Sequence, residues 1–320
     1  MKKDVVIVGG GPIGIACALE CQAKGLDYVV LEKGALTNSL YNYPLNMTFF
    51  STSEKLEIGG IPFISQAAKP NRNEALEYYR RVVSSNRLNI QPYEQVLDIE
   101  RTDHEFSIES SKGNYQSRYV IVCTGFYDIP KLLNVPGEEL PKVTHYFKEA
   151  HPYVLDKTIV VGASNSAVDA ALEIWRKGGD VTMVVRGPQI GERVKYWVRP
   201  DILNRIEEGS IKAYFDANIS RIEEGSVRIE TPQGSIELEN DWVIALTGYR
   251  PNYEFLERIG LELSQDDLKK PKYNEETMES SIPGLYLAGV ICGGMETHKW
   301  FIENSRIHAK QIVADMLAKA

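Results

Sequence analysis

Three glycines near the N-terminus have the spacing of a phosphate-binding turn. Gly9, Gly11 and Gly14 directly follow the apolar run at residues 5–8, and Pro12 stands inside the turn. In such a turn the first glycine permits the tight bend, the second lets the backbone approach a pyrophosphate, and the third lets helix and strand pack closely. The N-terminus of the following helix then offers free N–H groups to the anion. We therefore predict a dinucleotide site to which these four residues contribute.

An acidic residue marks the end of this first unit. A second apolar run at residues 28–31 ends at Glu32, and Lys33 follows it. A carboxylate at that point bonds ribose hydroxyls, and its negative charge disfavours a 2′-phosphate. The first unit therefore predicts a nucleotide with a free 2′-hydroxyl, such as FAD, and we include Glu32 and Lys33 among its contacts.

The same layout recurs in the middle of the chain and ends in a positive charge. An apolar run at residues 158–161 leads into Gly162, a helical pattern follows, and a strand pattern at residues 181–185 ends at Arg186. Serine and alanine replace the second and third glycines, and alanine is an accepted variant at the third place. An arginine at the strand end suits a 2′-phosphate and predicts NADPH, with a surface arginine as the alternative. The NADPH contacts that we predict are Gly162, Ser164, Asn165, Ser166, Arg186 and Arg193.

Three more apolar strands end in glycine. Two of them end in Thr-Gly, at Thr124 and Gly125 and again at residues 247–248, and the third ends at Gly289 before a glycine-rich turn and a last helical pattern. A strand that ends in Thr-Gly typically completes a nucleotide-binding sheet, and the chain then continues into a neighbouring domain. A last helix that points its N-terminus at the cofactor would suit a flavin, whose reduced ring is anionic. We therefore add Thr124, Gly125 and Gly289 to the FAD contacts.

The composition excludes several classes of protein. The chain has 320 residues with 36 basic and 44 acidic side chains, a net charge of −8, so the basic excess that nucleic-acid binding needs is absent. No uninterrupted apolar run reaches transmembrane length, and we expect no membrane partner. The four cysteines form no C-x-x-C pair, which argues against a metal site and a disulfide framework. The default setting is therefore a reducing cytoplasm.

Taken together, the two nucleotide units, the two Thr-Gly strands and the final Ala-Gly strand resemble the two-domain, thioredoxin-reductase-like flavoproteins. The resemblance spans essentially the whole chain. It implies an α/β fold of two Rossmann-like dinucleotide-binding domains, with the NADPH domain inserted into the FAD domain. The implied FAD domain is discontinuous, at residues 1–125 and 246–320, and the implied NADPH domain covers residues 126–245.

More specific strings resemble the YpdA-type bacillithiol disulfide reductases. They are Tyr41-Asn-Tyr-Pro44, Thr48-Phe-Phe-Ser51, Lys69-Pro70-x-Arg72-Asn73, the segment 145–153 and Phe301-Ile-Glu-Asn304. This resemblance implies an NADPH- and FAD-dependent reductase of bacillithiol disulfide, a low-molecular-weight substrate. It adds Thr48 to the FAD contacts, and we also expect a homo-oligomer.

Departures from the family patterns shape the expected mechanism. Thioredoxin reductases carry C-x-x-C shortly before the second glycine motif, whereas this chain has the cysteine-free segment 145–153, which excludes that dithiol relay. The aspartate of the wider family after Ala-Gly is Val290 here. Some bacillithiol disulfide reductases have a cysteine after the proline of the first glycine motif, where this chain has Ile13. We therefore expect hydride to pass from NADPH to FAD and then to the disulfide, directly or through a cysteine outside any motif.

Two residues are the catalytic candidates. Cys292 lies in the last glycine-rich turn, where a nearby helix N-terminus would lower the pKa of its thiol, and the alternative is a small turn residue. His145 could donate a proton to a leaving thiolate near neutral pH, or could be a hydrogen-bonded packing residue. Because the substrate carries several carboxylates, we expect cations at its pocket. The candidates, each of which could equally be a surface charge, are Lys69, Arg72, Lys148, Lys299 and Arg306.

Three other functions remain open. A thioredoxin-reductase-like ferredoxin–NADP reductase also lacks the dithiol, but it should need a basic docking surface, and the net charge here is −8. A flavin monooxygenase also pairs two such nucleotide units. A non-catalytic flavin redox sensor would use the same sites without turnover. Sequence separates these functions poorly because function resides in the site and not in the fold.

Overall fold

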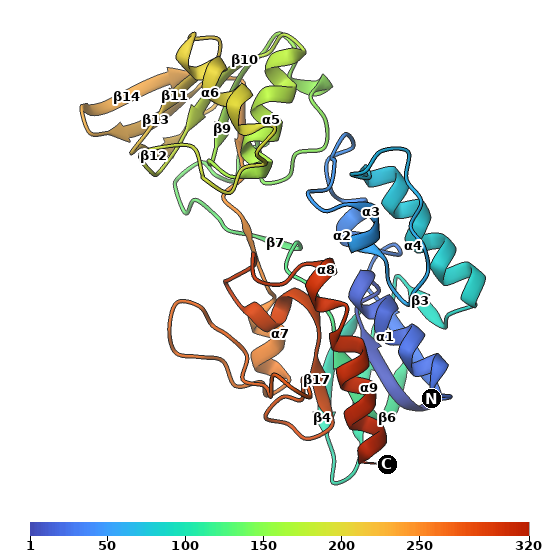
Figure 1. Cartoon of the computed structure of the whole chain (residues 1–320). Helices are drawn as coiled ribbons and strands as arrows, with labels where there is room; N and C mark the ends of the chain where they lie inside the picture. Colours follow the sequence, from blue (N-terminus) through green and yellow to red (C-terminus); the bar gives the residue numbers. More distant parts are fainter. Residues whose placement is uncertain (320) are drawn as a thin grey trace. The chain divides into compact units, whose positions relative to one another are not determined.

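The structure is a computed structural model that describes residues 1–319. The chain divides into two compact units, one inserted within the other (Figure 1). Unit 1 comprises residues 1–43, 47–129 and 249 onward, and unit 2 comprises residues 44–46 and 130–248. The two main junctions thus fall at residues 129–130 and 248–249, a few residues after the positions expected from the sequence.

Unit 1 is built on a parallel sheet with an antiparallel extension. The strand order is β3-β2-β1-β6-β5-β4, and β17 pairs with the end of β6. The pairs of β5 with β4 and with β6 are antiparallel. The last four residues of β1 and all five of β2 are buried, which explains their continuous apolar runs. The strands are β1 (Lys2–Val8), β2 (Tyr28–Glu32), β3 (Ile90–Pro92), β4 (Val96–Arg101), β5 (Phe106–Ser110), β6 (Asn114–Val122) and β17 (Leu285–Leu287).

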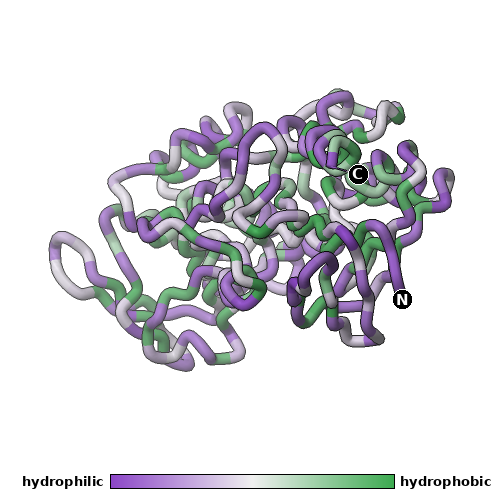
Figure 2. Tube along the Cα trace, turned by 90° about the horizontal axis from the view of Figure 1, so that it is seen from below, coloured by the Kyte–Doolittle hydropathy of each residue, from purple (hydrophilic) through white to green (hydrophobic). Residues whose placement is uncertain are grey.

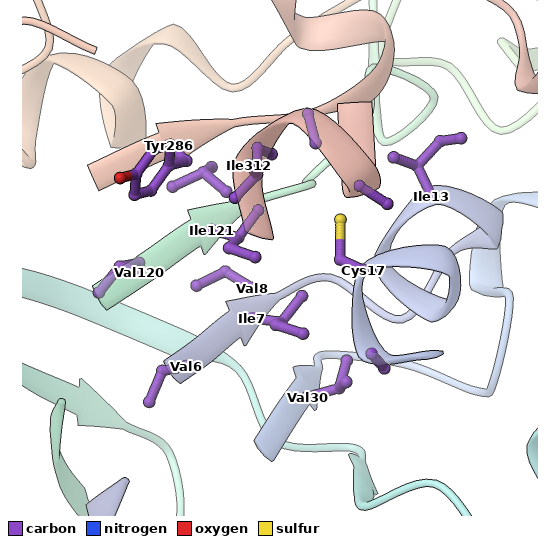
Figure 3. Close-up of a cluster of buried hydrophobic side chains, with 14 of the residues drawn as sticks. Val6, Ile7, Val8, Ile13, Cys17, Val30, Val120, Ile121, Tyr286 and Ile312 are labelled. Carbon is purple, nitrogen blue, oxygen red and sulfur yellow. The ribbon is translucent and has the colours of Figure 1, made fainter. Parts of the chain in front are cut away.

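Two helices from opposite ends of the chain share the core of unit 1. α1 and α9 lie side by side, and Figure 3 shows apolar side chains of β1 and β6 together with Cys17 of α1 and Ile312 of α9. The third long helix, α4, begins with a capping box in which Asn71 and Glu74 bond each other's backbone N–H. The helices are α1 (Pro12–Ala23), α2 (Asn38–Tyr41), α3 (Ser53–Leu56), α4 (Arg72–Asn86), α7 (Tyr253–Arg258), the 3₁₀ turn η2 (Gly289–Gly293), α8 (Ile302–Ser305) and α9 (His308–Ala318).

Unit 2 has its own five-stranded parallel sheet in the order β11-β10-β9-β15-β8. Its strands are β8 (Val143–Thr144), β9 (Lys157–Val161), β10 (Asp180–Val184), β11 (Lys212–Tyr214) and β15 (Trp242–Ala245), and its helices are η1 (His151–Tyr153), α5 (Asn165–Arg176) and α6 (Arg199–Glu207). A separate antiparallel sheet joins β12 (Asn218–Ile222), β13 (Ser226–Thr231) and β14 (Gly234–Glu239). The short strands β7 (Ile129–Pro130) and β16 (Tyr249–Arg250) pair at the junctions.

Each unit therefore carries a parallel sheet in which one strand, β1 in unit 1 and β9 in unit 2, leads into a long helix, as the α/β prediction required. Hydrophilic and hydrophobic residues are interleaved along the whole trace (Figure 2). Among residues 1–319, no helix combines the length and the apolar character needed to span a bilayer.

Candidate functional site: two glycine turns

The first glycine turn connects β1 to α1, and each glycine meets a different steric demand. A Cβ on Gly9, whose φ is +108°, would lie 2.6 Å from the carbonyl oxygen of Cys123. A Cβ on Gly14 would lie only 1.9 Å from the carbonyl oxygen of Gly9. A Cβ on Gly11 would meet nothing within 4 Å. Two glycines are therefore demanded by the packing of the turn itself, and the third leaves an open approach to the backbone.

The N-terminus of α1 lies at this open position. Gly11 is its N-cap, no side chain caps it, and Pro12 occupies the first turn. The early N–H groups of a helix have no partner within the helix and attract anions. Open space beside uncapped N–H groups is what a pyrophosphate requires, so these residues fit the expected cofactor.

Glu32 braces the turn from the end of β2. Its buried carboxylate accepts the N–H of Gly10 at 2.7 Å and that of Gly34 at 2.9 Å. Burial raises the pKa of this carboxyl group, and the two backbone bonds oppose that rise. Each carboxylate oxygen has a further lone pair, so a ribose hydroxyl can still bond it. Glu32 thus has a structural role that its position at a strand end did not indicate.

Three further FAD candidates surround this turn in unit 1. The hydroxyl of Thr124 is buried and has no hydrogen-bond partner among the described residues, which favours a bound group beside it. Gly125 follows with φ +71°. Lys33 pairs with Asp128 at 2.8 Å. The remaining candidate, Thr48, forms an isolated antiparallel bridge with Asn71.

A buried histidine, which sequence reasoning missed, holds the turn after β17. Gly289 has φ +83° and donates its N–H to Nδ1 of His308 at 3.2 Å. His308 is only 1% exposed, and burial lowers its pKa to about 4. The imidazole is therefore neutral at physiological pH, which keeps Nδ1 available as an acceptor. His308 lies 19 residues after Gly289 and belongs to no recognisable sequence motif, so the sequence could not predict this contact.

The second glycine turn, in unit 2, connects β9 to α5. Gly162 has φ +130°, and a Cβ on it would lie 2.6 Å from the carbonyl oxygen of Leu246 and 3.1 Å from Cβ of Ala167. The exposed Ser164 is the N-cap of α5, and its hydroxyl makes no capping bond. Ser166 is also exposed. The turn therefore repeats the strand-to-helix geometry of unit 1 with an uncapped helix N-terminus.

Asn165 ties this turn to the loop after β10. Its amide donates to the carbonyl of Arg193 at 3.2 Å and accepts the N–H of Lys195 at 2.8 Å. Lys195 is buried, and its ammonium group pairs with Asp169 at 2.7 Å. Arg186 and Arg193 are exposed, and no carboxylate of residues 1–319 forms an ion pair with either. Two uncommitted cations thus flank the second turn.

The thiol pKa of Cys292 is raised and not lowered as expected, so its catalytic role has no support from this environment. Cys292 is fully buried, and burial raises the pKa of its thiol well above the ordinary value. Its segment η2 is a 3₁₀ turn of five residues, and α8 begins only at Ile302, so no helix N-terminus starts at the thiol. Desolvation therefore dominates, and the group is a protonated thiol in the core.

His145, the other catalytic candidate, belongs to unit 2. Its Nε2 lies 3.4 Å from a carboxylate oxygen of Glu138. Cys292 belongs to unit 1, so the two catalytic candidates lie in different units. The contact with Glu138 orients the imidazole whatever its role.

Two of the five candidate substrate cations are engaged by backbone carbonyls of unit 1. The buried guanidinium of Arg72 donates to the carbonyls of Leu40 and Tyr41. Arg306 donates to the carbonyls of Glu54 and Glu57 at the short helix α3. Both arginines therefore tie one helix to another, Arg72 joining α4 to α2 and Arg306 joining the end of α8 to α3. No local pattern distinguishes this use from substrate binding.

Two further candidates, Lys69 and Lys299, are half-buried. Lys69 donates to the carbonyl of Phe50 and lies 4.9 Å from the centre of that residue's ring. Lys299 lies 4.0 Å from Glu275 and 5.3 Å from the centre of the Trp300 ring. Both ammonium groups face an aromatic ring, so their stems are held while the charge stays near solvent.

Comparison with known proteins places this geometry in a family. The model of the pyridine nucleotide-disulphide oxidoreductases matches residues 6–289. The bacilliredoxin reductase Bdr of Bacillus subtilis is 42% identical over 318 residues, covering 99% of this chain and 98% of the relative. Two solved structures of the bacillithiol disulfide reductase Bdr (YpdA) cover essentially the whole chain. The one from Staphylococcus aureus has 41% identity and a TM-score of 0.97, covering 100% of this chain and 99% of its own. The one from Bacillus cereus has 39% identity and a TM-score of 0.98, with 100% of both chains covered.

The chain belongs to the pyridine nucleotide-disulphide oxidoreductases. It is therefore an oxidoreductase of the flavoprotein kind, with two Rossmann-like units, and FAD and NADPH are its cofactors. Among its relatives, the reductases named Bdr share its full length and not merely its fold.

Proposed function

We propose that this enzyme reduces bacillithiol disulfide with electrons from NADPH. The observation that carries the proposal is the full-length likeness to the two bacillithiol disulfide reductase structures, at 41% and 39% identity. The two glycine turns support it, because each unit offers an uncapped helix N-terminus to a nucleotide. Glu32 in one unit and Arg186 in the other favour FAD in unit 1 and NADPH in unit 2.

The protein's part in this chemistry is binding, orientation and proton supply. The flavin ring, when bound, accepts a hydride from the nicotinamide and returns two electrons to the disulfide. In the balanced reaction, one NADPH, one proton and one disulfide give NADP⁺ and two thiols. The Gly9–Gly14 turn and Thr124 would hold FAD, while the Gly162 turn and Arg186 would hold NADPH. We propose His145, held against Glu138, as the donor of the proton to the leaving thiolate.

We infer that none of the three buried cysteines relays the electrons. Cys17, Cys21 and Cys292 are all buried. The thiol pKa is raised at each of them, by a hydrogen bond with Cys123 and by burial at Cys17, and chiefly by burial at Cys21 and Cys292. A protonated, solvent-excluded thiol is a poor nucleophile toward a disulfide. Ile13 removes the one motif position at which some relatives carry a cysteine. Two routes would remain, direct transfer from the cofactor to the substrate and a relay through the half-buried Cys123.

An anaerobic half-reaction tests the proposal. The FAD-loaded protein is reduced with one equivalent of NADPH while the flavin absorbance is followed, and bacillithiol disulfide is then added. We expect the oxidised flavin spectrum to return as two thiols are released. A flavin that bleaches but stays reduced until ferredoxin or oxygen is added would replace this function by a ferredoxin–NADP reductase or a monooxygenase. Reduction by NADPH with no turnover on any acceptor would indicate a redox sensor.

A second substrate is suggested by the name of the Bacillus subtilis relative, a bacilliredoxin reductase. That name describes a protein disulfide and not a small molecule. The same half-reaction separates the two when a bacilliredoxin carrying a mixed disulfide with bacillithiol is added in place of the free disulfide. If the bacilliredoxin reoxidises the flavin and the free disulfide does not, the proposed substrate becomes the bacilliredoxin.

A further inference from the structure

Lys131, just after β7, lies across the carboxyl edge of the sheet in unit 2. Its N–H donates to the carbonyl of Gly248 at 2.9 Å, and its own carbonyl accepts the hydroxyl of Thr247 at 2.5 Å. A Cβ on Gly248 would lie 3.8 to 3.9 Å from Cδ, Cε and Nζ of this lysine. The lysine stem therefore runs past Gly248 beyond the end of β15, at ordinary van der Waals distance from where a Cβ would lie. The backbone bonds fix where the side chain starts.

The same edge of the sheet carries Arg186 and the second glycine turn. In the strand order, β9 lies between β10 and β15, so Arg186 after β10 and Lys131 over β15 flank the Gly162 turn after β9. Strands two apart in a sheet are about 10 Å apart, a span that a lysine and an arginine side chain can close together. Burial lowers the pKa of Lys131, and the positive charge of Arg186 lowers it further.

This cationic pair has no carboxylate partner in the described part of the chain. Within residues 1–319 neither Lys131 nor Arg186 forms an ion pair with a carboxylate. Like charges near each other raise the free energy of the folded state unless an anion lies between them. Two positive groups beside an uncapped helix N-terminus are thus arranged for a ligand with more than one negative group.

We propose that Lys131 is a specificity-determining residue that binds the 2′-phosphate of NADPH jointly with Arg186. This inference rests on the proposed function, since it deepens the assignment of NADPH to unit 2. An ammonium group supplies a point charge beside the planar fork of the arginine, so one phosphate can accept bonds from both. NADH lacks the 2′-phosphate and gains nothing from Lys131.

Binding of nucleotide fragments tests the role of Lys131 without turnover. Calorimetry on the FAD-loaded protein would compare the Kd of adenosine 2′,5′-bisphosphate with that of 5′-AMP, which lacks the 2′-phosphate. We expect Lys131→Met to weaken the bisphosphate about tenfold and to change 5′-AMP less than about twofold, as loss of one charge-assisted bond predicts. Lys131→Arg should restore most of the preference. Lys177→Met, an exposed lysine at the opposite end of α5, is the matched control and should leave both values unchanged.

The other outcomes are decisive in different ways. Equal weakening of both fragments in Lys131→Met would assign Lys131 to the 5′-phosphate and overturn the proposal, as would no change in either. A wild-type protein without preference for the bisphosphate would overturn both the proposal and the choice of NADPH. The identity of the disulfide substrate does not enter this measurement, so its failure in the flavin assay would leave the result for Lys131 standing.

Discussion

At the scale of single residues, burial decides which of the reactive side chains can react. Cys292 and His308 both lie in unit 1 with almost no exposed surface, and burial favours the neutral form of each. For the cysteine this means a thiol and no thiolate, which removes a nucleophile. For the histidine it means a permanent acceptor for the N–H of Gly289. The same physical effect therefore disqualifies one candidate and defines the role of another residue.

Replacing Cys292 tests whether electrons pass from the cofactor to the disulfide without this thiol. We expect Cys292→Ala to retain the NADPH-dependent reduction rate of the disulfide within about twofold and to lose about 1 kcal/mol of stability, because only packing is removed. Cys21→Ala, another fully buried cysteine of the same core, is the control for the packing effect. A loss of more than tenfold in kcat at Cys292 with a normal Cys21 variant would show that the thiol takes part.

The buried His308 predicts a pH dependence of stability. Its pKa is about 4 in the folded protein, against 6.5 for an ordinary, solvent-exposed histidine, the value we assign to the unfolded chain. Between these two pH values the unfolded chain binds more protons than the folded one. Stability should therefore be complete above pH 6.5 and should fall as the pH drops toward 4, by roughly 3 kcal/mol in all. Chemical denaturation of wild type and His308→Gln across this range measures the difference. Parallel pH profiles for the two proteins would contradict the assignment.

At the scale of elements, the strand-to-helix turns combine two demands that glycine satisfies for different reasons. The turn between β1 and α1 requires glycine at two places because protein atoms would collide with a Cβ. It uses glycine at the third, Gly11, where no protein atom is near. Sterics inside the fold explain the first two, and only a ligand explains the third.

A matched pair of glycine variants separates these two demands. Gly14→Ala would place a Cβ 1.9 Å from the carbonyl oxygen of Gly9, so we expect α1 to be displaced and about 3 kcal/mol or more of stability to be lost. Gly11→Ala meets nothing within 4 Å, and its φ of −75° suits alanine. The FAD-free protein should then unfold at its normal temperature but bind FAD at least tenfold more weakly, as followed by flavin fluorescence. Normal FAD binding by Gly11→Ala would move the pyrophosphate away from this turn.

At the scale of the whole molecule, the two cofactors should stabilise different units. Each unit has its own apolar core and its own nucleotide turn. A ligand that binds only folded protein adds about 2.7 kcal/mol at one hundred times its Kd.

Calorimetric melting of protein stripped of FAD tests this separation. We expect the removal of FAD to lower the unfolding temperature of unit 1 by several degrees. NADP⁺ should raise the unfolding temperature of unit 2 whether FAD is present or not. The matched control is NAD⁺, which should raise the second transition less at equal concentration. A single transition that both ligands shift equally would mean that the two units do not unfold separately.

The sequence by itself determined the class of fold, the two cofactors and the kind of enzyme. These follow from local spacing, because a strand, a glycine turn, a helix and a charged strand end are neighbours along the chain and need no distant partner to be recognised. The glycines at 9, 11, 14 and 162 are such local signals. The opposite charges of Glu32 and Arg186 at the two strand ends are another.

Tertiary structure alone decided what each isolated charged or reactive side chain does. Arg72 and Arg306 each tie one helix to another, His308 holds Gly289, Cys292 is buried, and the charge of Arg186 acts on Lys131, which follows β7. Each of these outcomes depends on residues tens to hundreds of positions apart in the chain. Burial and pairing are properties of such distant contacts, and they set both the protonation of a group and the partners left for it to bind.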